Sequence, residues 1–395
     1  MAVHRARLQQ FEEFLESDVI DLKQLRKMCF KGCPFETSSS RSLSWKLLLN
    51  YLPRKRADWE EVLAKERNAY KQFIDEMIVK PGSKGYGSNR IDVTLSDHPL
   101  NPNPESEWST YFADNEMLVQ VDKDCRRLCP DLSFFQQASD YPCKELNDHT
   151  ARVETLQKRV ENSVLKSETV SRNRHGITNM LPTRRRTSTD DFLKLPPGQE
   201  AHWEVCERIL FIYAKLNPGQ GYVQGMNEIL GPIYYVFATD PCEDNKAHAE
   251  ADAFFCFTNL MGEIRDNFIK SLDDSEHGIG NLMKSLMALL KEKDSRLWSR
   301  LEMNNLKPEF YAFRWLTLLL SQEFQLPDVL RLWDSLFSDE GRFQFLIYVC
   351  CAMLILIRQE MFDADFSMMM KLLQNYPLSD VQLIVNKAAE LRGDS

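Results

Sequence analysis

Long apolar runs are missing from this chain of 395 residues. The longest unbroken run, residues 345–357, has 13 residues, whereas a helix that crosses a membrane needs roughly 20. Arg358 and Glu360 close this run, so we interpret it as a buried core helix. Neither Met1 and Ala2 nor the end of the sequence at Ser395 carries a lipidation motif. We therefore expect no transmembrane segment and only indirect contact with membranes.

Signals for β-strands are also scarce. β-Branched residues are sparse, no alternating pattern of useful length occurs, and no Asn-Gly or Asp-Gly pair separates two candidate strands. Helical spacing of apolar residues recurs instead. It is clearest in residues 8–30, 59–79, 115–127, 209–216, 229–237, 253–261, 282–290, 310–320, 329–337 and 345–357. These segments predict an all-α fold.

Patterns that would hold a metal or a nucleotide are absent from the sequence. The seven histidines form no HxxxH or HExxH pattern, and the two close cysteine pairs, 29/33 and 125/129, lack the tight CxxC spacing. The ten cysteines lie mostly among apolar residues, so we expect reduced, buried thiols. Residues 81–88 are rich in glycine but match no phosphate-binding loop. The sequence thus predicts no metal site and no cofactor of its own.

An excess of positive charge is missing too. The formal net charge of −9 argues against a nucleic-acid binder, because such proteins concentrate Lys and Arg against phosphates. Basic residues gather only near residues 152–187, where nine Lys and Arg stand against three glutamates. This composition predicts a charged helix that passes into a flexible, inserted loop.

The most distinctive stretch is residues 219–228, where glycines, a tyrosine and amides lie between two apolar segments. Gly219, Gly221 and Gly225 would let the backbone pass close to another surface. Gln224 carries both a donor and an acceptor on an uncharged side chain. The plainer alternative is an ordinary corner between two helices.

Two further stretches could carry either structure or function. Asp124 and Arg127 are neighbours on a helix, so the carboxylate can orient the guanidinium, although most such pairs are only solvated ion pairs worth less than about 1 kcal/mol. Earlier in the chain, Ser42 can cap a helix that contains Trp45. We expect Trp45 to anchor the core.

These stretches together resemble the TBC-domain family of GTPase-activating proteins for Rab GTPases. The family's IxxDxxR pattern is similar to VDKDCRR at 121–127, with valine replacing isoleucine, and its YxQGM pattern matches 222–226. Its opening RxxxW helix is similar to RSLSW at 41–45, and its later core segments resemble FRWL at 313–316 and LRLWD at 330–334. All of these occur in the family's order, which makes coincidence improbable.

The resemblance implies a two-lobed helical TBC domain over residues 32–345, with the basic insertion near 152–187 inside it. Residues 1–31 would form a helical extension before it, and residues 346–395 would form helices that pack on it. The side chains implied to support this domain are Arg41, Trp45, Arg314, Trp315 and Trp333.

The resemblance also implies a mechanism. Arg127 and Gln224 would enter the nucleotide site of a GTP-bound Rab, which brings the GTP and Mg²⁺, and would accelerate hydrolysis in trans. Asp124, Tyr222, Gly225 and Met226 would support or orient them. Such a protein would act in vesicle trafficking, in the cytoplasm and transiently at endomembranes.

Two departures from the family pattern bear on activity. Leu128 stands where threonine is common, and the 97 positions from Arg127 to Gln224 form a long gap that the basic insertion would explain. A catalytically weak adaptor that holds a Rab in the same groove is the alternative function. It has no chemical need for both Arg127 and Gln224, so their presence favours the activator. A helical-repeat scaffold would show a fixed period, and none is found.

Overall fold

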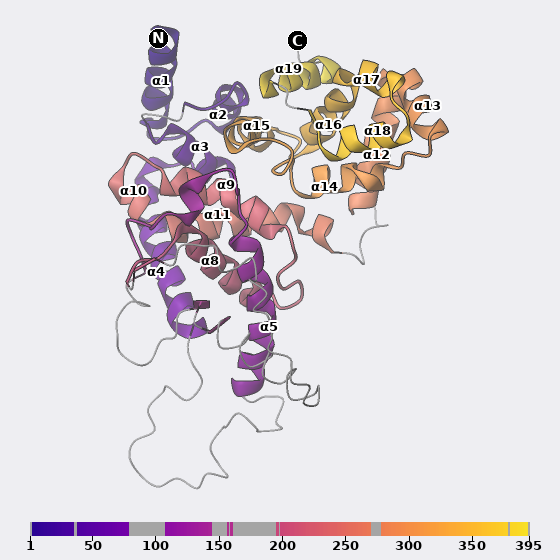
Figure 1. Cartoon of the computed structure of the whole chain (residues 1–395). Coiled ribbons are helices and arrows are strands. Elements are labelled where there is room, and N and C mark those ends of the chain that lie inside the picture. Colours follow the sequence, from indigo (N-terminus) through magenta and orange to yellow (C-terminus); the bar gives the residue numbers. More distant parts are fainter. Residues whose placement is uncertain are drawn as a thin grey trace, which may run out of the picture. The chain divides into compact units, whose positions relative to one another are not determined.

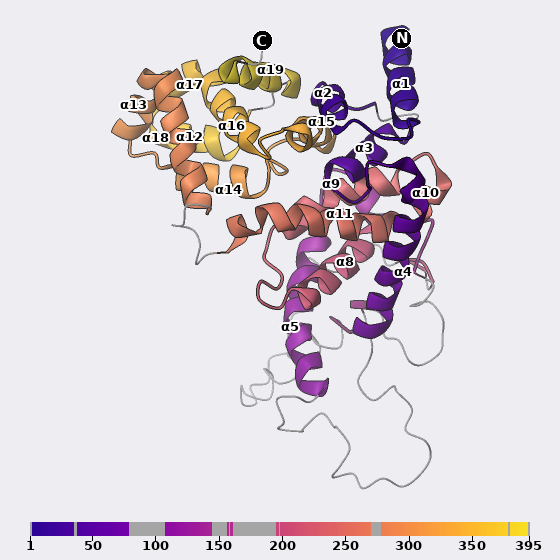
Figure 2. The ribbon, with the colours of Figure 1, turned by 180° about the vertical axis from the view of Figure 1, so that it is seen from behind.

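The computed structural model confirms the all-α prediction for the residues that it describes (Figures 1 and 2). In those residues the only strand-like contacts are two isolated bridges, Val19 with Lys55 and Ala138 with Ala201. The structure describes residues 2–34, 38–78, 107–143, 156–157, 159–160, 195–196, 198–269, 278–377 and 380–393. Within these ranges it describes the side chains of all residues except 2–4 and 107–110.

The chain divides into two compact units, residues 1–67 with 228–395 and residues 68–227. The second unit holds the stretches 121–127 and 222–226, which carry Arg127 and Gln224. Its helices are the end of α4 (Trp59–Met77), α5 (Glu107–Cys125), the 3₁₀ turn η2 (Ser133–Gln136) and α8 (His202–Leu216). Helices α5 and α8 pack side by side (Figure 1).

The first unit contains the remaining helices. Aspartates cap several of them: Asp21, Asp294, Asp365 and Asp380 each accept a hydrogen bond from a backbone N–H of the first turn, a contact worth about 1 kcal/mol. The helices are α1 (Ala2–Leu15), α2 (Leu22–Phe30), α3 (Ser40–Leu48), α9 (Met226–Ala238), α10 (Glu243–Ala247), α11 (Ala249–Ile264), α12 (Ile279–Lys293), α13 (Ser295–Met303), α14 (Ala312–Thr317), α15 (Leu326–Ser338), α16 (Gln344–Leu356), α17 (Arg358–Asp363), α18 (Phe366–Gln374) and α19 (Val381–Arg392).

The long apolar run forms a core helix, as predicted. Helix α16 covers almost all of it, and most of its side chains are buried. It packs against α19 and α12. No helix among the described residues is long and apolar enough to cross a membrane.

Two sequence predictions about helix bounds are wrong. Ser42 is no cap: α3 begins at Ser40, where the Ser38 hydroxyl accepts from the Ser40 N–H, and the Ser42 side chain is buried inside the helix. Residues 310–320 are not one helix, because α14 ends at Thr317 and Leu319 and Leu320 take left-handed backbone angles, with φ of 50° and 63°. Both leucines are buried, so the apolar pattern reported burial rather than helix.

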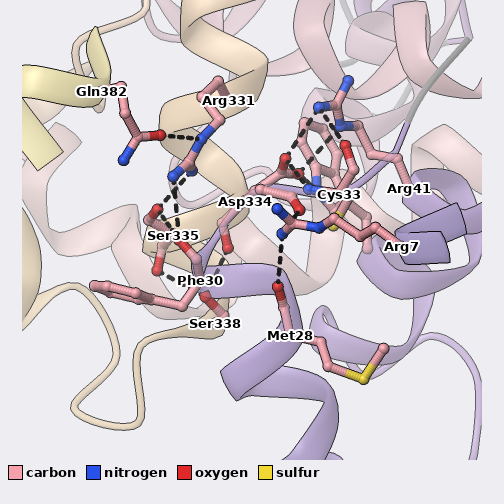
Figure 3. A network of polar contacts seen from close by, with 12 residues as sticks. Arg7, Met28, Phe30, Cys33, Arg41, Arg331, Asp334, Ser335, Ser338 and Gln382 are labelled. Carbon is pink, nitrogen blue, oxygen red and sulfur yellow. Dashed lines mark hydrogen bonds and ion pairs between the residues drawn. The ribbon is translucent and has the colours of Figure 1, made fainter. Parts of the chain in front are cut away.

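A buried carboxylate joins the start of the first unit to α15 (Figure 3). Asp334 accepts hydrogen bonds from the Cys33 backbone N–H at 2.7 Å, from Arg41 at 3.0 and 3.2 Å, and from Trp45 Nε1 at 2.8 Å. The Asp334 side chain has no exposed surface. Its charge is therefore balanced by Arg41 and its oxygens are satisfied, which burial requires.

The other residues expected to support the domain also lie in this unit. Trp333 and Trp315 are buried, and Trp333 packs against Trp45 with ring centroids 6.1 Å apart. Arg314 is partly exposed and binds both oxygens of Glu323, at 2.6 and 2.9 Å.

A second buried network was not foreseen from the sequence. Asp252 on α11 accepts from Lys46 at 2.6 Å, from Tyr51 at 2.8 Å, and from Nε and Nη2 of Arg67. The side chains of Asp252 and Lys46 are almost fully buried.

Candidate functional site

Arg127 lies in the turn that directly follows α5. Its backbone N–H donates to the Asp124 carbonyl, and its guanidinium Nε donates to the Lys123 carbonyl at 3.0 Å. Nη2 donates to Asp124 Oδ1, also at 3.0 Å. The side chain is nonetheless 68% exposed, and Nη1 has no partner among the described residues. One edge of the guanidinium is thus held by the protein while the other is open to a partner.

Asp124 connects this turn to the loop that carries Gln224. Its second oxygen, Oδ2, accepts from the Tyr222 hydroxyl at 2.9 Å, and its backbone carbonyl accepts from Asn227 Nδ2 at 3.3 Å. The Asp124 side chain is only 8% exposed. A single buried carboxylate therefore binds Arg127 with one oxygen and Tyr222, two positions before Gln224, with the other.

Gln224 projects from a loop whose neighbouring residues are anchored. Met226 is buried, and its sulfur accepts from the Val223 N–H at 3.4 Å. Gly225 is buried as well and has a φ of 103°, which favours glycine. Gln224 itself is exposed, and its side chain makes no hydrogen bond to any described residue. Its amide is thus presented to solvent by a fixed backbone.

The packing of α5 on α8 supports this arrangement. Lys215 on α8 donates to Asp114 on α5 at 2.6 Å. Arg159 also contacts α5: its Nη2 donates to the Tyr111 carbonyl at 2.9 Å, and its guanidinium lies over the Tyr111 ring. Arg159 belongs to the segment predicted to be a charged helix that passes into a flexible loop, and its side chain is buried against these groups. Apart from residues 156–157 and 159–160, the segment 152–187 lies outside the described residues, as do residues 81–88.

Arg126, the residue before Arg127, makes its contacts with buried groups and is largely shielded from solvent. Its Nε donates to Asp122 at 2.9 Å, and its guanidinium lies 4.3 Å from the centre of the Trp203 ring. Nearby on α8, Glu207 is buried and has a carboxyl oxygen without a hydrogen-bond partner. Burial, and then the charges of Asp122 and Glu204, raise the pKa of Glu207 well above its usual range. We did not foresee this buried acid, because no local pattern distinguishes it.

The arrangement provides a cation and an amide but no obvious metal ligands. Among the described residues no group of histidine, cysteine or acidic side chains could hold a metal ion, and eight of the ten cysteines are buried. An arginine with a free, exposed edge can stabilise negative charge on a bound partner. A free primary amide can both accept from and donate to a water molecule.

Comparison with known proteins places the chain in a family. The family model described as the Rab-GTPase-TBC domain matches residues 154–362. The chain belongs to the TBC-domain family. Among curated TBC proteins, human TBC1 domain family member 13 is 58% identical over 396 residues, covering 99% of each chain, and the mouse protein of that name is equally similar. A TBC domain-containing protein of Schizosaccharomyces pombe is 37% identical, over 98% of this chain and 73% of its own length.

A solved TBC structure also shares the fold. The Ypt/Rab-GAP domain of Gyp1p superposes with a TM-score of 0.66 at 21% identity, covering 99% of this chain and 98% of that domain. The family resemblance inferred from the motifs at 121–127 and 222–226 is thereby confirmed.

Proposed function

We propose that this TBC protein accelerates GTP hydrolysis by a Rab GTPase, with Arg127 and Gln224 supplied in trans. The observation that carries the proposal is the shared carboxylate of Asp124, which binds Arg127 at 3.0 Å and Tyr222 at 2.9 Å. It fixes the turn that bears the arginine to the loop that bears the glutamine. GTP and Mg²⁺ belong to the partner in this mechanism.

Arg127 stabilises charge in the transition state. Hydrolysis builds negative charge on the phosphoryl and leaving oxygens, and an arginine from a second protein lowers the barrier by a rate factor of roughly 10³ to 10⁵. Because Asp124 and the Lys123 carbonyl already hold one edge of the guanidinium, Nη1 is the part free to reach a phosphate oxygen.

Gln224 orients the attacking water. Its carbonyl oxygen accepts a hydrogen bond from the water, while its NH₂ group donates to the partner. Its lack of any bond within the described chain leaves both groups available. Since only one amide can occupy the position beside the nucleophile, Gln224 displaces the glutamine with which many GTPases position this water themselves.

Contact with membranes follows from the partner in this proposal. A lipidated Rab would bring the protein to an endomembrane, and the result would be termination of a Rab signal in vesicle trafficking. The Rab itself is selected by the shape and charge of the docking surface rather than by the two catalytic side chains.

The test is phosphate release from a panel of GTP-loaded Rabs. For the Rab that responds most strongly, a variant with leucine at its own catalytic glutamine should remain responsive, whereas Gln224→Ala should abolish acceleration of the unmodified Rab. Gln359→Ala, at an exposed glutamine of α17, is the matched control and should be fully active. A refractory leucine-substituted Rab together with an active Gln224→Ala variant would contradict the role of Gln224. Binding without acceleration by any Rab would favour the adaptor.

A further inference from the structure

None of the described residues accounts for glycine at position 219. It is exposed, and its backbone does not adopt the left-handed angles that favour glycine. A Cβ atom placed on it would meet nothing within 4 Å. Neither backbone strain nor packing therefore excludes a larger side chain at this position.

Several other glycines do have a reason within the chain to be glycine. Gly221, two positions later, has a φ of 65°, and the buried Gly225 has a φ of 103°. Gly32, in the first unit, is held at 91° and a Cβ there would lie 2.8 Å from Arg331 Nε. Each of these glycines meets a local demand, whereas the described residues place none on Gly219 and leave its surface open to a partner.

The loop around Gly219 presents main chain to solvent at Gly219, beside the exposed Pro218, while the neighbouring amide side chains turn inward. The Gln220 carbonyl oxygen accepts from the Tyr213 hydroxyl, and its NH₂ group is buried, so this side chain turns inward. Asn217 Nδ2 likewise donates inward, to the Tyr213 carbonyl. The Gly219 N–H has no acceptor among the described residues. A partner that approaches this loop would thus meet backbone and an unused donor.

The loop is also fixed in place. The N–H groups of Gln220 and Gly221 both donate to the Asn217 carbonyl, at 3.0 and 2.7 Å, and the Asn217 N–H donates to the Tyr213 carbonyl of α8. A preorganised surface of this kind loses little conformational freedom on binding. It leads directly into the segment that contains Tyr222 and Gln224.

We propose that the main chain of residues 218–221 is a docking surface for the GTPase, and that Gly219 lets a backbone segment of the partner come into direct contact with it. This inference rests on the proposed function, because it places the contact beside Gln224. The partner segment carries a backbone carbonyl for the free Gly219 N–H. Close approach here sets how far Gln224 reaches into the nucleotide site.

The test is a size series, Gly219→Ala, Gly219→Leu and Gly219→Trp, assayed with the Rab that responds best to the wild-type protein. The variants should fold normally, with unchanged thermal unfolding. We expect KM for the GTP-loaded Rab to rise with side-chain size, on the order of ten-fold for leucine and a hundred-fold for tryptophan, each ten-fold step being about 1.4 kcal/mol. The kcat at saturation should change little.

Gly262 provides the matched control, since it is also exposed, has no left-handed φ and has open space around its Cβ position. Gly262→Trp should leave KM unchanged. An unchanged KM in Gly219→Trp would overturn the inference, and so would a fall in kcat alone, because that would indicate a displaced loop rather than a blocked surface.

Two readouts separate failure of the docking surface from failure of the proposed function. Arg127→Ala is assayed in parallel: if it loses acceleration while Gly219→Trp does not, only the docking surface is wrong. Affinity for the GTP-loaded Rab is also measured directly with Arg127→Ala, alone and combined with Gly219→Trp. Weaker binding by the double variant supports the surface even if catalysis is assigned wrongly, and equal binding overturns it. If no Rab binds at all, both proposals fall.

Discussion

Two aspartates in different units of this protein bind the same kinds of group with opposite results. Asp334 accepts from Arg41 and the Trp45 indole, and Asp124 accepts from Arg127 and the Tyr222 phenol. Both carboxylates are buried. The arginines differ, because the Arg41 side chain is 9% exposed and that of Arg127 is 68% exposed.

The difference shows how the same set of interactions can bury an arginine or leave one edge of it open to solvent. Arg41 donates hydrogen bonds inside the protein, to Asp334 and to the Cys33 carbonyl. Arg127 uses one edge in the same way and keeps the other in solvent. A buried carboxylate can thus close a core around an arginine or hold an arginine ready for a partner.

The largest effect should come from Arg127→Ala. Because the guanidinium is exposed, the thermal unfolding temperature should stay within a few degrees of that of the wild type, while acceleration of GTP hydrolysis falls by about 10³-fold or more. Arg127→Lys should recover little, since a point charge lacks the planar fork. Arg265→Ala removes a similarly exposed, paired arginine and should be silent. Single-turnover hydrolysis measures all three, and full activity of Arg127→Ala would refute the assignment.

Asp334→Ala should lower the stability of the protein rather than its catalytic activity. It leaves the Arg41 guanidinium buried without its partner, a defect that costs about 3–5 kcal/mol. Unfolding in urea should show this loss in the free energy of unfolding, together with lower activity only in proportion to the unfolded fraction. Glu390→Ala breaks an exposed pair with Lys387 and should change the free energy by less than about 1 kcal/mol. An Asp334→Ala variant as stable as the wild type would mean that the hydrogen bonds to Asp334 do not stabilise this core.

Tyr222→Phe tests the role of Asp124 by removing the hydroxyl that donates to this carboxylate. Asp124 keeps Arg127 but loses the hydrogen bond from the Tyr222 hydroxyl. We therefore expect kcat to fall by about ten-fold, equivalent to about 1.4 kcal/mol in the barrier, with little change in KM. Tyr213→Phe removes another hydroxyl that bonds to the same loop and serves as the control. Equal kcat in Tyr222→Phe and wild type would show that the bond does not position the catalytic side chains.

The last effect is a dependence of stability on pH. Burial and the neighbouring acids raise the pKa of Glu207, so the folded protein keeps a proton that the unfolded chain releases above about pH 4.3. Stability contributed by this group is therefore present below that pH and declines as pH rises toward the folded pKa, by up to about 1.4 kcal/mol per unit. Glu207→Gln should flatten this decline in urea-unfolding data from pH 5 to 8. An unchanged slope would mean that Glu207 is ionised in the folded state.

Local patterns in the sequence predicted most of the fold but not its polar interior. Helical spacing is a short-range signal. It located both ends of α16 to within one residue and the end of α8, but α8 begins at His202 rather than at residue 209. It could not show that residues 319 and 320 leave the helix, because burial alone demands apolar side chains there. Nor could it pair Arg41 with Asp334, which lie 293 positions apart.

The candidate site divides in the same way. Asp124 and Arg127 are one helical turn apart, so their ion pair followed from spacing. The bond from Tyr222 to Asp124 spans 98 positions and has no local signature, so only the family resemblance suggested that the two motifs act together. Gln224 was singled out by its chemistry, and its freedom from internal bonds emerged from the structure.

The shared carboxylate of Asp124 also has a consequence for timing. Because Arg127 and the Tyr222 loop are tied to one point when the protein folds, much of their freedom of movement is lost before any partner arrives. Two side chains on independent flexible segments would each have to find their place during a brief encounter. In the proposed mechanism a single collision would deliver both, and the chance that a short-lived complex ends in hydrolysis would rise accordingly.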